Sequence, residues 1–449
     1  MAPRFGTDGI RGAANSELTP ELVLALGRSV VKVLRPRKCL VGRDTRRSGP
    51  MLSAALSAGM ASEGVEVVDV GIVPTPAVAH LSNALGVPGL VVSASHNPFA
   101  DNGVKVFAAG GLKLDSVREA EIEENLEALI RVSPEAEPVE RRAGAAVGDI
   151  VDGRSLLDLY QDHLFGALEG RTLAGLSVVV DCANGAAASL AEQVFSRAGA
   201  DVTAIASDPD GLNINTACGS THPELLAGAV IESGADIGLA FDGDADRLLA
   251  VDSKGSLVDG DQLISLFARD LAVRGLLKGN SVAVTVMTNL GFHRAMDEAG
   301  IKVVQTPVGD RNVLDAIESN GLVIGGEQSG HIIFRDLATT GDGLLTGLLV
   351  ADLICRSGAS LEDLAAGAMT RLPQCLLNVR VENVDDVHDS SAVREAVLRA
   401  ENELRHQGRV LLRASGTEPV VRVMVEAPSE QTAGRIAAEI AEVVKSHLW

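Results

Sequence analysis

The sequence lacks the long hydrophobic run that a membrane span needs. Hydrophobic residues make up 46% of its 449 residues, but no stretch of about 18 uncharged apolar residues occurs. The segment Met1–Gly12 carries Arg4, Asp8 and Arg11 and contains no apolar core of a secretory signal. We therefore expect a cytoplasmic protein without a membrane partner, whose apolar residues form buried strands and helices.

Cysteine is also scarce. The chain has five cysteines, an odd number, and no two of them form a CxxC pair. This pattern favours neither a disulfide framework nor a zinc site. We expect reduced thiols in the core.

Basic residues are too few to balance the acidic ones. The chain has 39 Lys and Arg residues and 60 Asp and Glu residues, which gives a formal net charge of −21. Such a charge repels nucleic-acid backbones and anionic membrane surfaces, so we expect no nucleic-acid partner. A small anionic substrate remains compatible, because a cleft needs only a few basic side chains.

The length and the periodicity indicate several α/β domains. At about 150 residues per domain, a chain of this length predicts about three. Apolar runs typical of buried strands, such as Leu176–Val180, Val282–Val286 and Ile301–Gln305, alternate with helical patterns, which favours parallel or mixed sheets. Helices are expected at Pro20–Leu34, Met51–Glu63, Leu190–Ala198, Asp261–Arg274 and Leu344–Arg356.

Three breaks in the pattern suggest domain boundaries. Residues 131–153 lose their periodicity and gather proline and glutamate, as a surface connection would. A second break follows the acidic loop at 242–247, and a third precedes a strand–helix–strand–strand–helix pattern that starts near 372. We therefore expect four domains, at residues 1–151, 152–252, 253–371 and 372–449.

Ser95 and His96 follow a strand-like apolar run, Gly89–Val92, in a turn that ends with Asn97 and Pro98. Ligands bind at such strand ends in open α/β sheets, so Ser95 is a candidate nucleophile or phosphoryl carrier. An isolated Ser-His pair is more often an ordinary turn. A Gly-x-Ser-x-Gly hydrolase elbow is absent.

A second loop places carboxylates at alternate positions. Asp242, Asp244 and Asp246 follow the strand-like run Ile237–Phe241, and Arg247 ends the loop. Three such carboxylates repel one another unless a cation lies between them, which favours a metal site over a solvated acidic turn.

The types of ligand in this loop narrow the choice of metal ion. A calcium loop requires Gly at the sixth position and Glu at the twelfth, but these positions hold Arg247 and Ser253. Zinc normally takes Cys and His ligands, which the loop lacks. Oxygen ligation therefore points to magnesium or manganese.

Further turn-rich segments carry recognition groups. In residues 413–419, Arg413, the hydroxyls of Ser415 and Thr417 and the backbone around Gly416 can cradle a phosphate, with Arg422 nearby, although a polar hairpin turn fits equally well. In residues 325–331, Glu327 and Ser329 can hold two sugar hydroxyls while His331 lies near a transferred proton. Residues 5–12 form a third such segment.

Several basic residues lie near these loops, namely Arg11, Arg43, Lys105, Arg247 and Arg311. Each is more often a solvated charge than a catalytic group. Lys105 is the most suggestive, because it follows Ser95 closely enough to fold back over it. A lowered pKa would let it act as a base.

Taken together, these segments resemble the α-D-phosphohexomutase family, in the family's order and over essentially the whole chain. The matching motifs are the N-terminal signature (5–12), the phosphoserine loop (93–98), the metal loop (242–247), the sugar-binding loop (325–331) and the phosphate-binding loop (413–419). Ser93, Ser329 and the stretch Asp210–His222 are most similar to the branch that acts on glucosamine phosphates. A joint match at several functional loops outweighs the ordinary-turn interpretation of each.

The resemblance implies an architecture and a metal site. Three α/β domains with mixed sheets and a smaller C-terminal α+β domain would surround a central cleft. Ser95 would be phosphorylated in the active state, and one phosphate oxygen would complete a Mg²⁺ site, one per active site, formed with Asp242, Asp244 and Asp246. The metal would offset charge on the moving phosphoryl group.

The resemblance also implies an intramolecular phosphotransferase of the isomerase class. The phosphoserine would convert glucosamine 6-phosphate into a bisphosphorylated sugar, which turns around and returns its other phosphate to Ser95 as glucosamine 1-phosphate. Glucosamine 1,6-bisphosphate would be the intermediate, and this compound or glucose 1,6-bisphosphate the activator. The product would supply amino-sugar nucleotide and peptidoglycan precursor synthesis.

Individual roles follow by the same resemblance. Proton transfer maps onto Arg11, His96 and Lys105, with His331 as a further candidate, and Arg247 joins the catalytic group. The substrate-binding residues are Glu327, Ser329, His331 and Arg311. The phosphate that is not reacting would be held by Arg413, Ser415, Gly416, Thr417 and Arg422.

The alternatives keep the same loops but change the activity. The chain can instead be a phosphomannomutase or phosphoglucomutase of the same architecture, a sugar-phosphate-binding protein without turnover, or a phosphatase. A homodimer formed through the first domain is a family-level expectation. Rotation of the last domain about a linker near Pro373 would open the cleft.

Overall fold

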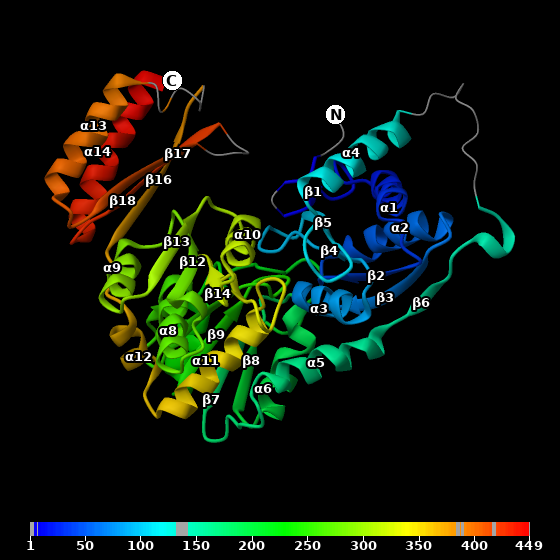
Figure 1. Ribbon diagram of the computed structural model, residues 1–449, viewed down its shortest axis with the longest axis horizontal. Helices are drawn as coiled ribbons and strands as arrows, with labels where there is room; N and C mark the ends of the chain where they lie inside the picture. The colour runs from blue at the N-terminus through cyan, green and yellow to red at the C-terminus, as the bar shows by residue number, and fades with distance from the viewer. Residues whose placement is uncertain are drawn as a thin grey trace. The chain divides into compact units, whose positions relative to one another are not determined.

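The computed structural model describes residues 4–6, 8–131, 142–382, 387, 390–414 and 419–448 (Figure 1). The chain divides into two compact units. The first unit comprises Met1–Met287 and Lys302–Ala366, and the second comprises Thr288–Ile301 and Gly367–Trp449.

The first sheet of unit one has six strands in the order β1-β5-β4-β2-β3-β6. β2 runs parallel to β3 and β4, whereas β5 runs antiparallel to β4 and β1, so the sheet is mixed. Its elements are β1 (Ile10–Ala13), α1 (Pro20–Leu34), β2 (Lys38–Arg43), α2 (Gly49–Ser62), β3 (Glu66–Ile72), α3 (Thr75–Leu85), β4 (Gly89–Val92), β5 (Asp101–Phe107), α4 (Ser116–Ile130), η1 (Gly144–Ala146) and β6 (Ile150–Asp152).

Helices cover both faces of this sheet, as Figure 1 shows for α1 and α2 on one side and α3 on the other. Val41 of β2 belongs to the hydrophobic core that includes residues of α1 and α2. At the next position, a Cβ added to Gly42 would lie 2.6 Å from Val78 of α3. Because successive strand residues face opposite sides, β2 is buried on both.

The second sheet has five strands in the order β11-β10-β9-β7-β8. β9 lies between β7, to which it is parallel, and β10, to which it is antiparallel, and all five of its residues are buried. The elements are η2 (Arg154–Leu156), α5 (Leu157–Gly166), β7 (Ser177–Asp181), η3 (Ala186–Ser189), α6 (Ala191–Arg197), β8 (Asp201–Ile205), α7 (Glu224–Ser233), β9 (Ile237–Phe241), β10 (Leu248–Asp252) and β11 (Leu257–Val258).

The third sheet has four strands in the order β13-β12-β14-β15, and only the β14–β15 pair is antiparallel. α8 begins with a capping box in which Asp259 and Gln262 satisfy each other's backbone N–H groups. The elements are α8 (Gly260–Val273), η4 (Lys278–Asn280), β12 (Ser281–Thr285), β13 (Lys302–Thr306), α10 (Asp310–Asn320), β14 (Ile324–Gly326), β15 (Ile332–Phe334), α11 (Gly343–Ser357) and α12 (Leu361–Ala368).

Unit two contains an antiparallel three-stranded sheet in the order β16-β18-β17. Helices α13 and α14 lie side by side on it (Figure 1), and their apolar faces form one core with the strands. The elements are α9 (Leu290–Glu298), β16 (Gln374–Arg380), α13 (Ser391–Leu404), β17 (Arg409–Ala414), β18 (Val420–Glu426) and α14 (Glu430–Leu448).

The expected fold class, α/β with mixed sheets and a C-terminal α+β part, is confirmed. The helices and strands predicted from the sequence agree with the structure to within two residues at each end. The C-terminal strand–helix–strand–strand–helix pattern is present as β16, α13, β17, β18 and α14.

One segment packs with a different part of the chain from the one expected from the sequence. Thr288–Ile301, expected within residues 253–371, belongs to the C-terminal unit. The Asn289 side chain exchanges two hydrogen bonds, each of 3.0 Å, with the backbone of Leu372, and Glu426 accepts one from the backbone of Leu290. These buried polar contacts tie α9 to the strands that follow it by more than seventy residues in sequence.

No single helix in the described part of the chain has both the length and the apolar composition to cross a membrane. The bent pair of α11 and α12 meets that criterion only when the two helices are taken together.

Candidate active site

Ser95 follows the C-terminal end of β4 in a turn that gives it a left-handed φ of 51°. Its Oγ donates a hydrogen bond to Asp242 and lies 3.4 Å from Nδ1 of His96. A residue with a Cβ rarely adopts this φ, so the surrounding structure must hold the turn. The result is a fully buried hydroxyl that faces the acidic loop.

The acidic loop connects β9 to β10 and gathers three buried carboxylates, those of Asp242, Asp244 and Asp246. One oxygen from each lies within 4.8 Å of the other two. One oxygen of Asp244 and one of Asp246 are buried without a hydrogen-bond partner. Buried carboxylate oxygens without partners are costly unless a cation binds them. The residues present therefore fit a hard divalent cation.

The surroundings shift the pKa values of two carboxylates in this cluster in opposite directions. Burial and the charges of Asp246 and Asp244 raise the pKa of Asp242 well above its usual range. Burial would also raise the pKa of Asp246, but the charge of Lys105 and the contact with His331 together outweigh burial and hold that pKa well below its usual value.

Lys105, on β5, reaches the same cluster. Its Nζ lies 2.7 Å from Asp244, 3.0 Å from Asp246 and 3.2 Å from Asp8. Burial alone would lower the pKa of Lys105, but these carboxylates raise it well above its ordinary value. The prediction that a lowered pKa lets Lys105 act as a base is therefore wrong for this arrangement, because three anions stabilise the ammonium form.

The remaining basic candidates also lie near the cluster. Arg11 pairs with Asp8, and Arg247 Nε lies 3.8 Å from Asp246. The Nε atoms of both arginines are buried and have no hydrogen-bond partner among the residues that the structure describes. Burial, together with the charges of Arg247 and Arg11, lowers the pKa of His96 to about 4, so its imidazole is neutral at pH 7.

The predicted sugar-binding loop follows β14 and lies next to the start of β10, directly after the acidic loop, since the backbone N–H of Leu248 donates to the carbonyl of Gly330. The hydroxyl of Ser329 is buried without a partner, whereas Glu327 accepts a bond of 3.0 Å from Gly309. His331 is buried, accepts a bond from the Gly341 backbone at Nε2, and places Nδ1 3.7 Å from Asp246. Of these side chains, Ser329 has the clearest unused hydrogen-bonding capacity.

Arg311, at the start of α10, is already paired. Both of its terminal nitrogens contact the carboxylate of Glu119 on α4, one of them at 2.8 Å. Such a two-pronged pair is among the stronger hydrogen-bonded contacts that an arginine forms. A substrate phosphate that binds Arg311 must therefore compete with Glu119.

The predicted phosphate-binding loop belongs to unit two. Arg413 on β17 and Arg422 on β18 are paired positions of the antiparallel ladder. The Nε of Arg422 is buried without a hydrogen-bond partner. Ser415, Gly416 and Thr417 lie outside the described residues.

Sequence reasoning missed three residues that complete the cluster. Thr75, at the start of α3, donates its hydroxyl to Asp244 and its backbone N–H to the Asp244 carbonyl. Lys113 bridges Asp8 and Asp310. Asp8 lies in the same segment as Arg11 and could have been included for that reason, whereas Thr75 and Lys113 carry no local signal.

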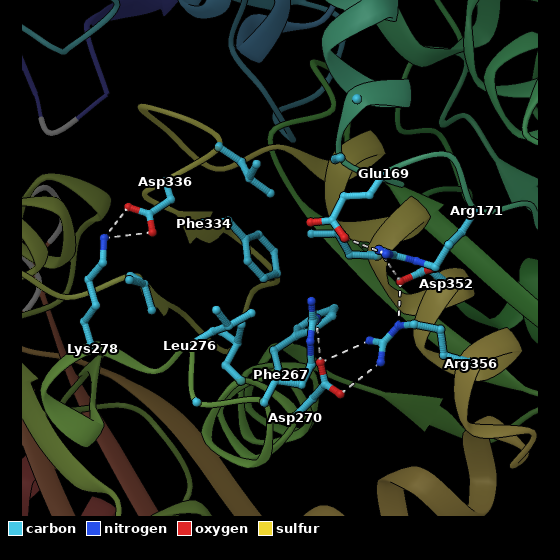
Figure 2. Close-up of a pocket in the computed structure, with 18 residues that line it drawn as sticks. Glu169, Arg171, Phe267, Asp270, Leu276, Lys278, Phe334, Asp336, Asp352 and Arg356 are labelled. Atoms are coloured by element: carbon cyan, nitrogen blue, oxygen red, sulfur yellow. Dashed lines mark hydrogen bonds and ion pairs between the residues drawn. The ribbon is translucent and has the colours of Figure 1, made fainter.

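A separate cavity of about 390 Å³ lies between the segment after α5 and the elements α8, β15 and α11 (Figure 2). Phe267 and Phe334 form part of its apolar wall, with ring centroids 4.8 Å apart in an edge-to-face contact. On one side, Asp352 and Arg356 belong to a chain of ion pairs. Of the predicted site residues that the structure describes, none lines this cavity.

Comparison with known proteins confirms the resemblance. Models of the phosphoglucomutase/phosphomannomutase family match in order, with alpha/beta/alpha domain I at residues 2–131, domain II at 158–255, domain III at 259–372 and the C-terminal domain at 376–443. The phosphoglucosamine mutase of Streptomyces griseus is 51% identical over 458 residues, covering 100% of both chains. That of Frankia alni is 52% identical over 461 residues, covering 100% of this chain and 99% of the relative.

Solved structures agree with this assignment. A phosphoglucomutase/phosphomannomutase family protein from Burkholderia thailandensis has a TM-score of 0.81 and 26% identity, covering 99% of this chain and 98% of that one. The Aspergillus fumigatus N-acetylphosphoglucosamine mutase, solved with GlcNAc-6P and magnesium, has the same fold, with a TM-score of 0.69 and 21% identity over 99% of this chain and 95% of that one. By its family models and its full-length identity to these relatives, the chain belongs to the phosphoglucomutase/phosphomannomutase family.

Proposed function

We propose that this chain is a phosphoglucosamine mutase, an isomerase that interconverts glucosamine 6-phosphate and glucosamine 1-phosphate through a phosphorylated Ser95. The observation that carries this proposal is the hydrogen bond from Ser95 to Asp242 within a buried triplet of carboxylates. The choice of sugar is supported by the full-length relatives of that name, at 51% and 52% identity.

The reaction consists of two phosphoryl transfers. In the first, phosphorus forms a bond to O1 of glucosamine 6-phosphate while its bond to Ser95 Oγ breaks. The proton of the O1 hydroxyl passes to a base. In the second, the phosphoryl group on O6 of the resulting 1,6-bisphosphate returns to Ser95 Oγ. O6 takes up a proton, and glucosamine 1-phosphate leaves. Glucose 1,6-bisphosphate would serve as an external donor that phosphorylates Ser95.

Asp242, Asp244 and Asp246 would hold magnesium, which when bound offsets negative charge on the transferring phosphoryl group. Within the described residues, one oxygen of Asp244 and one of Asp246 are buried and accept no hydrogen bond, which supports this assignment. Lys105 would limit the repulsion among the carboxylates, since it contacts two of the three.

The neighbouring basic residues have separate proposed roles. Arg11 and Arg247 would stabilise phosphoryl oxygens, because each has a buried Nε without a partner. His96 is neutral and its Nδ1 lies 3.4 Å from Ser95 Oγ. It would accept the proton of the attacking sugar hydroxyl and return a proton to the sugar oxygen that leaves.

The remaining loops would bind the rest of the substrate. Ser329, Glu327 and His331 would contact the sugar, and Arg311 would contact a phosphate after leaving Glu119. The phosphate that is not reacting would be held by Arg413, Ser415, Gly416, Thr417 and Arg422. These roles correspond to four proposed domains at residues 1–151, 152–252, 253–371 and 372–449.

The test is to incubate the purified protein with magnesium, glucosamine 6-phosphate and a trace of glucose 1,6-bisphosphate, and to follow the products by phosphorus NMR. We expect glucosamine 1-phosphate from the wild type and none from Ser95→Ala. Glucose and mannose 6-phosphates are assayed in parallel.

Other outcomes would change the assignment. Faster turnover of glucose or mannose 6-phosphate would keep the chemistry and reject the proposed sugar. Release of free phosphate without isomer would indicate a phosphatase. Binding of magnesium and bisphosphate without any exchange of phosphate would indicate a binding protein.

A further inference from the structure

The main-chain carbonyls of the Ser95 turn converge on one buried side chain. Arg46, whose guanidinium is fully buried, donates from Nη2 to the carbonyls of Ser95 and Asn97, at 2.8 Å each. Its Nη1 donates to the carbonyls of Pro98 and, at 3.0 Å, Asp101. A single planar fork therefore holds four carbonyls of one loop.

The fork is itself fixed in place. Arg46 Nε donates to Asp44 at 2.9 Å, and the same carboxylate oxygen accepts a hydrogen bond of 2.6 Å from the hydroxyl of Ser93. The Ser93 hydroxyl in turn accepts a bond of 3.0 Å from the backbone N–H of Ser95. Both the N–H and the carbonyl of Ser95 are thus tied to one buried network.

A second donor reaches the same carbonyls from another sheet of unit one. The amide nitrogen of Asn215 donates to Ser95 at 2.9 Å and to Asn97 at 3.1 Å. Asn215 lies in the loop between β8 and α7 and is buried. Close by, a Cβ added to Gly243 in the acidic loop would lie 2.5 Å from the Ser95 carbonyl oxygen, so that position is closely packed.

We propose that Arg46 and Asn215 are positioning residues for phosphoryl transfer. They hold the carbonyl of Ser95 and thereby keep its left-handed backbone in place, so that Oγ stays directed at Asp242. The inference rests on the proposed function, since it concerns the same serine. An error of about 1 Å in the position of a reacting group can cost about 100-fold in rate.

The test compares Arg46→Lys and Asn215→Asp with the wild type. Lysine keeps the positive charge opposite Asp44 but cannot hold four carbonyls with a planar fork. Aspartate keeps the size of Asn215 and tolerates its left-handed φ of 58°, but turns an oxygen toward two carbonyl oxygens. For each variant we expect kcat to fall about 100-fold while the KM for glucosamine 6-phosphate changes less than about twofold.

A matched control is Arg28→Lys. Arg28 is also a buried arginine, and its side chain pairs with Glu63 at 2.7 Å rather than with a carbonyl of the Ser95 turn. We expect its kcat to stay within about twofold of the wild type, even if its thermal unfolding midpoint drops as far as that of Arg46→Lys.

The outcomes separate the two proposals. Unchanged kcat in Asn215→Asp and in folded Arg46→Lys, or a rise in KM alone, would overturn the positioning role. If Arg46→Lys does not fold, Asn215→Asp decides. If the wild type isomerises no hexose phosphate, the proposed function fails. The rate at which glucose 1,6-bisphosphate phosphorylates Ser95, followed by intact mass, then tests positioning, and equal rates in wild type and variants would reject it.

Discussion

Ser95 Oγ donates a hydrogen bond to the carboxylate of Asp242, which lies 147 residues further along the chain. The bond joins the turn after β4 to the loop after β9, two strands of different sheets. Ligand sites form at such strand ends in open α/β sheets, and here two of them face each other. The proposed phosphoryl carrier and the proposed metal site are thereby brought together, although neither local sequence requires the other.

Loss of one proposed metal ligand should reduce both the rate and the response to magnesium. For Asp244→Asn we expect kcat to fall at least about 100-fold and half-maximal activation to need more magnesium, because a carboxylate ligand loses its charge. Initial rates measured against magnesium concentration check this. Asp252→Asn is the control, since Asp252 is buried in a turn where it accepts bonds from Lys254 and Ser256. Matching magnesium curves for Asp244→Asn and wild type would contradict the metal assignment.

Removal of the lysine between the carboxylates should destabilise the protein most in the absence of metal. For Lys105→Met we expect the unfolding midpoint without magnesium to fall by about 5 °C or more, because buried carboxylates lose their cation. Magnesium should stabilise this variant more than the wild type. Calorimetry with and without magnesium measures both effects. Lys254→Met, which removes an exposed ion pair with Glu362, should change the midpoint little. An equal change in both variants would argue against a role for Lys105.

Acid should weaken the fold partly through His80. Burial and the nearby charge of His163 lower the pKa of His80 to about 4, and the two rings stack with centroids 4.2 Å apart. An unfolded histidine takes up a proton near pH 6.5, whereas the folded one stays neutral until about pH 4. His80 therefore costs stability progressively as the pH falls from about 6.5 to about 4.

The His80→Gln variant isolates this contribution. Between pH 7 and pH 4.5 it should lose less stability than the wild type, by about 1 kcal/mol once solvent screening of this half-buried group is allowed for. Thermal melts across that range provide the measurement. Parallel curves for the two proteins would mean that His80 titrates normally in the folded state.

Release of Arg311 from its internal partner should tighten substrate binding. Glu119 now occupies both terminal nitrogens of Arg311. In Glu119→Gln the partner loses its charge, so we expect the KM for glucosamine 6-phosphate to fall severalfold, whereas Arg311→Met should raise it. Steady-state kinetics distinguish these cases. Glu318→Gln is the control, because Glu318 pairs with Arg335 and is partly exposed. A KM that does not respond to either change would exclude Arg311 from substrate binding.

The sequence alone specified the elements and most of the chemistry. Apolar runs as short as Gly89–Val92 and Ile237–Phe241 favour buried strands over helices by their length, and the structure confirms both strands. The polar loops that follow them are candidate ligand sites. The alternate aspartates already favoured a hard metal, whereas the isolated Ser-His pair fitted an ordinary turn better, so phosphoryl transfer rested on the resemblance to one family. Ordered loops of one family supplied the rest of the assignment.

Tertiary structure decided which charges meet. From the sequence, Lys105 was a candidate base if its pKa were lowered. The fold instead places that side chain among Asp244, Asp246 and Asp8, and the sign of a pKa shift depends on such neighbours. Arg311 was expected to face substrate, yet it pairs with Glu119, 192 residues away.

Arg46 shows the same limit for a residue that no motif identifies. From its sequence context, a charged residue in a basic stretch, Arg46 would be expected at the surface. In the folded chain its side chain is buried and donates hydrogen bonds to four main-chain carbonyls. Local sequence determines strands, helices and the chemical character of loops because these depend on nearby residues. The partners of buried charges are set by contacts between distant segments, and only the folded chain brings those segments together.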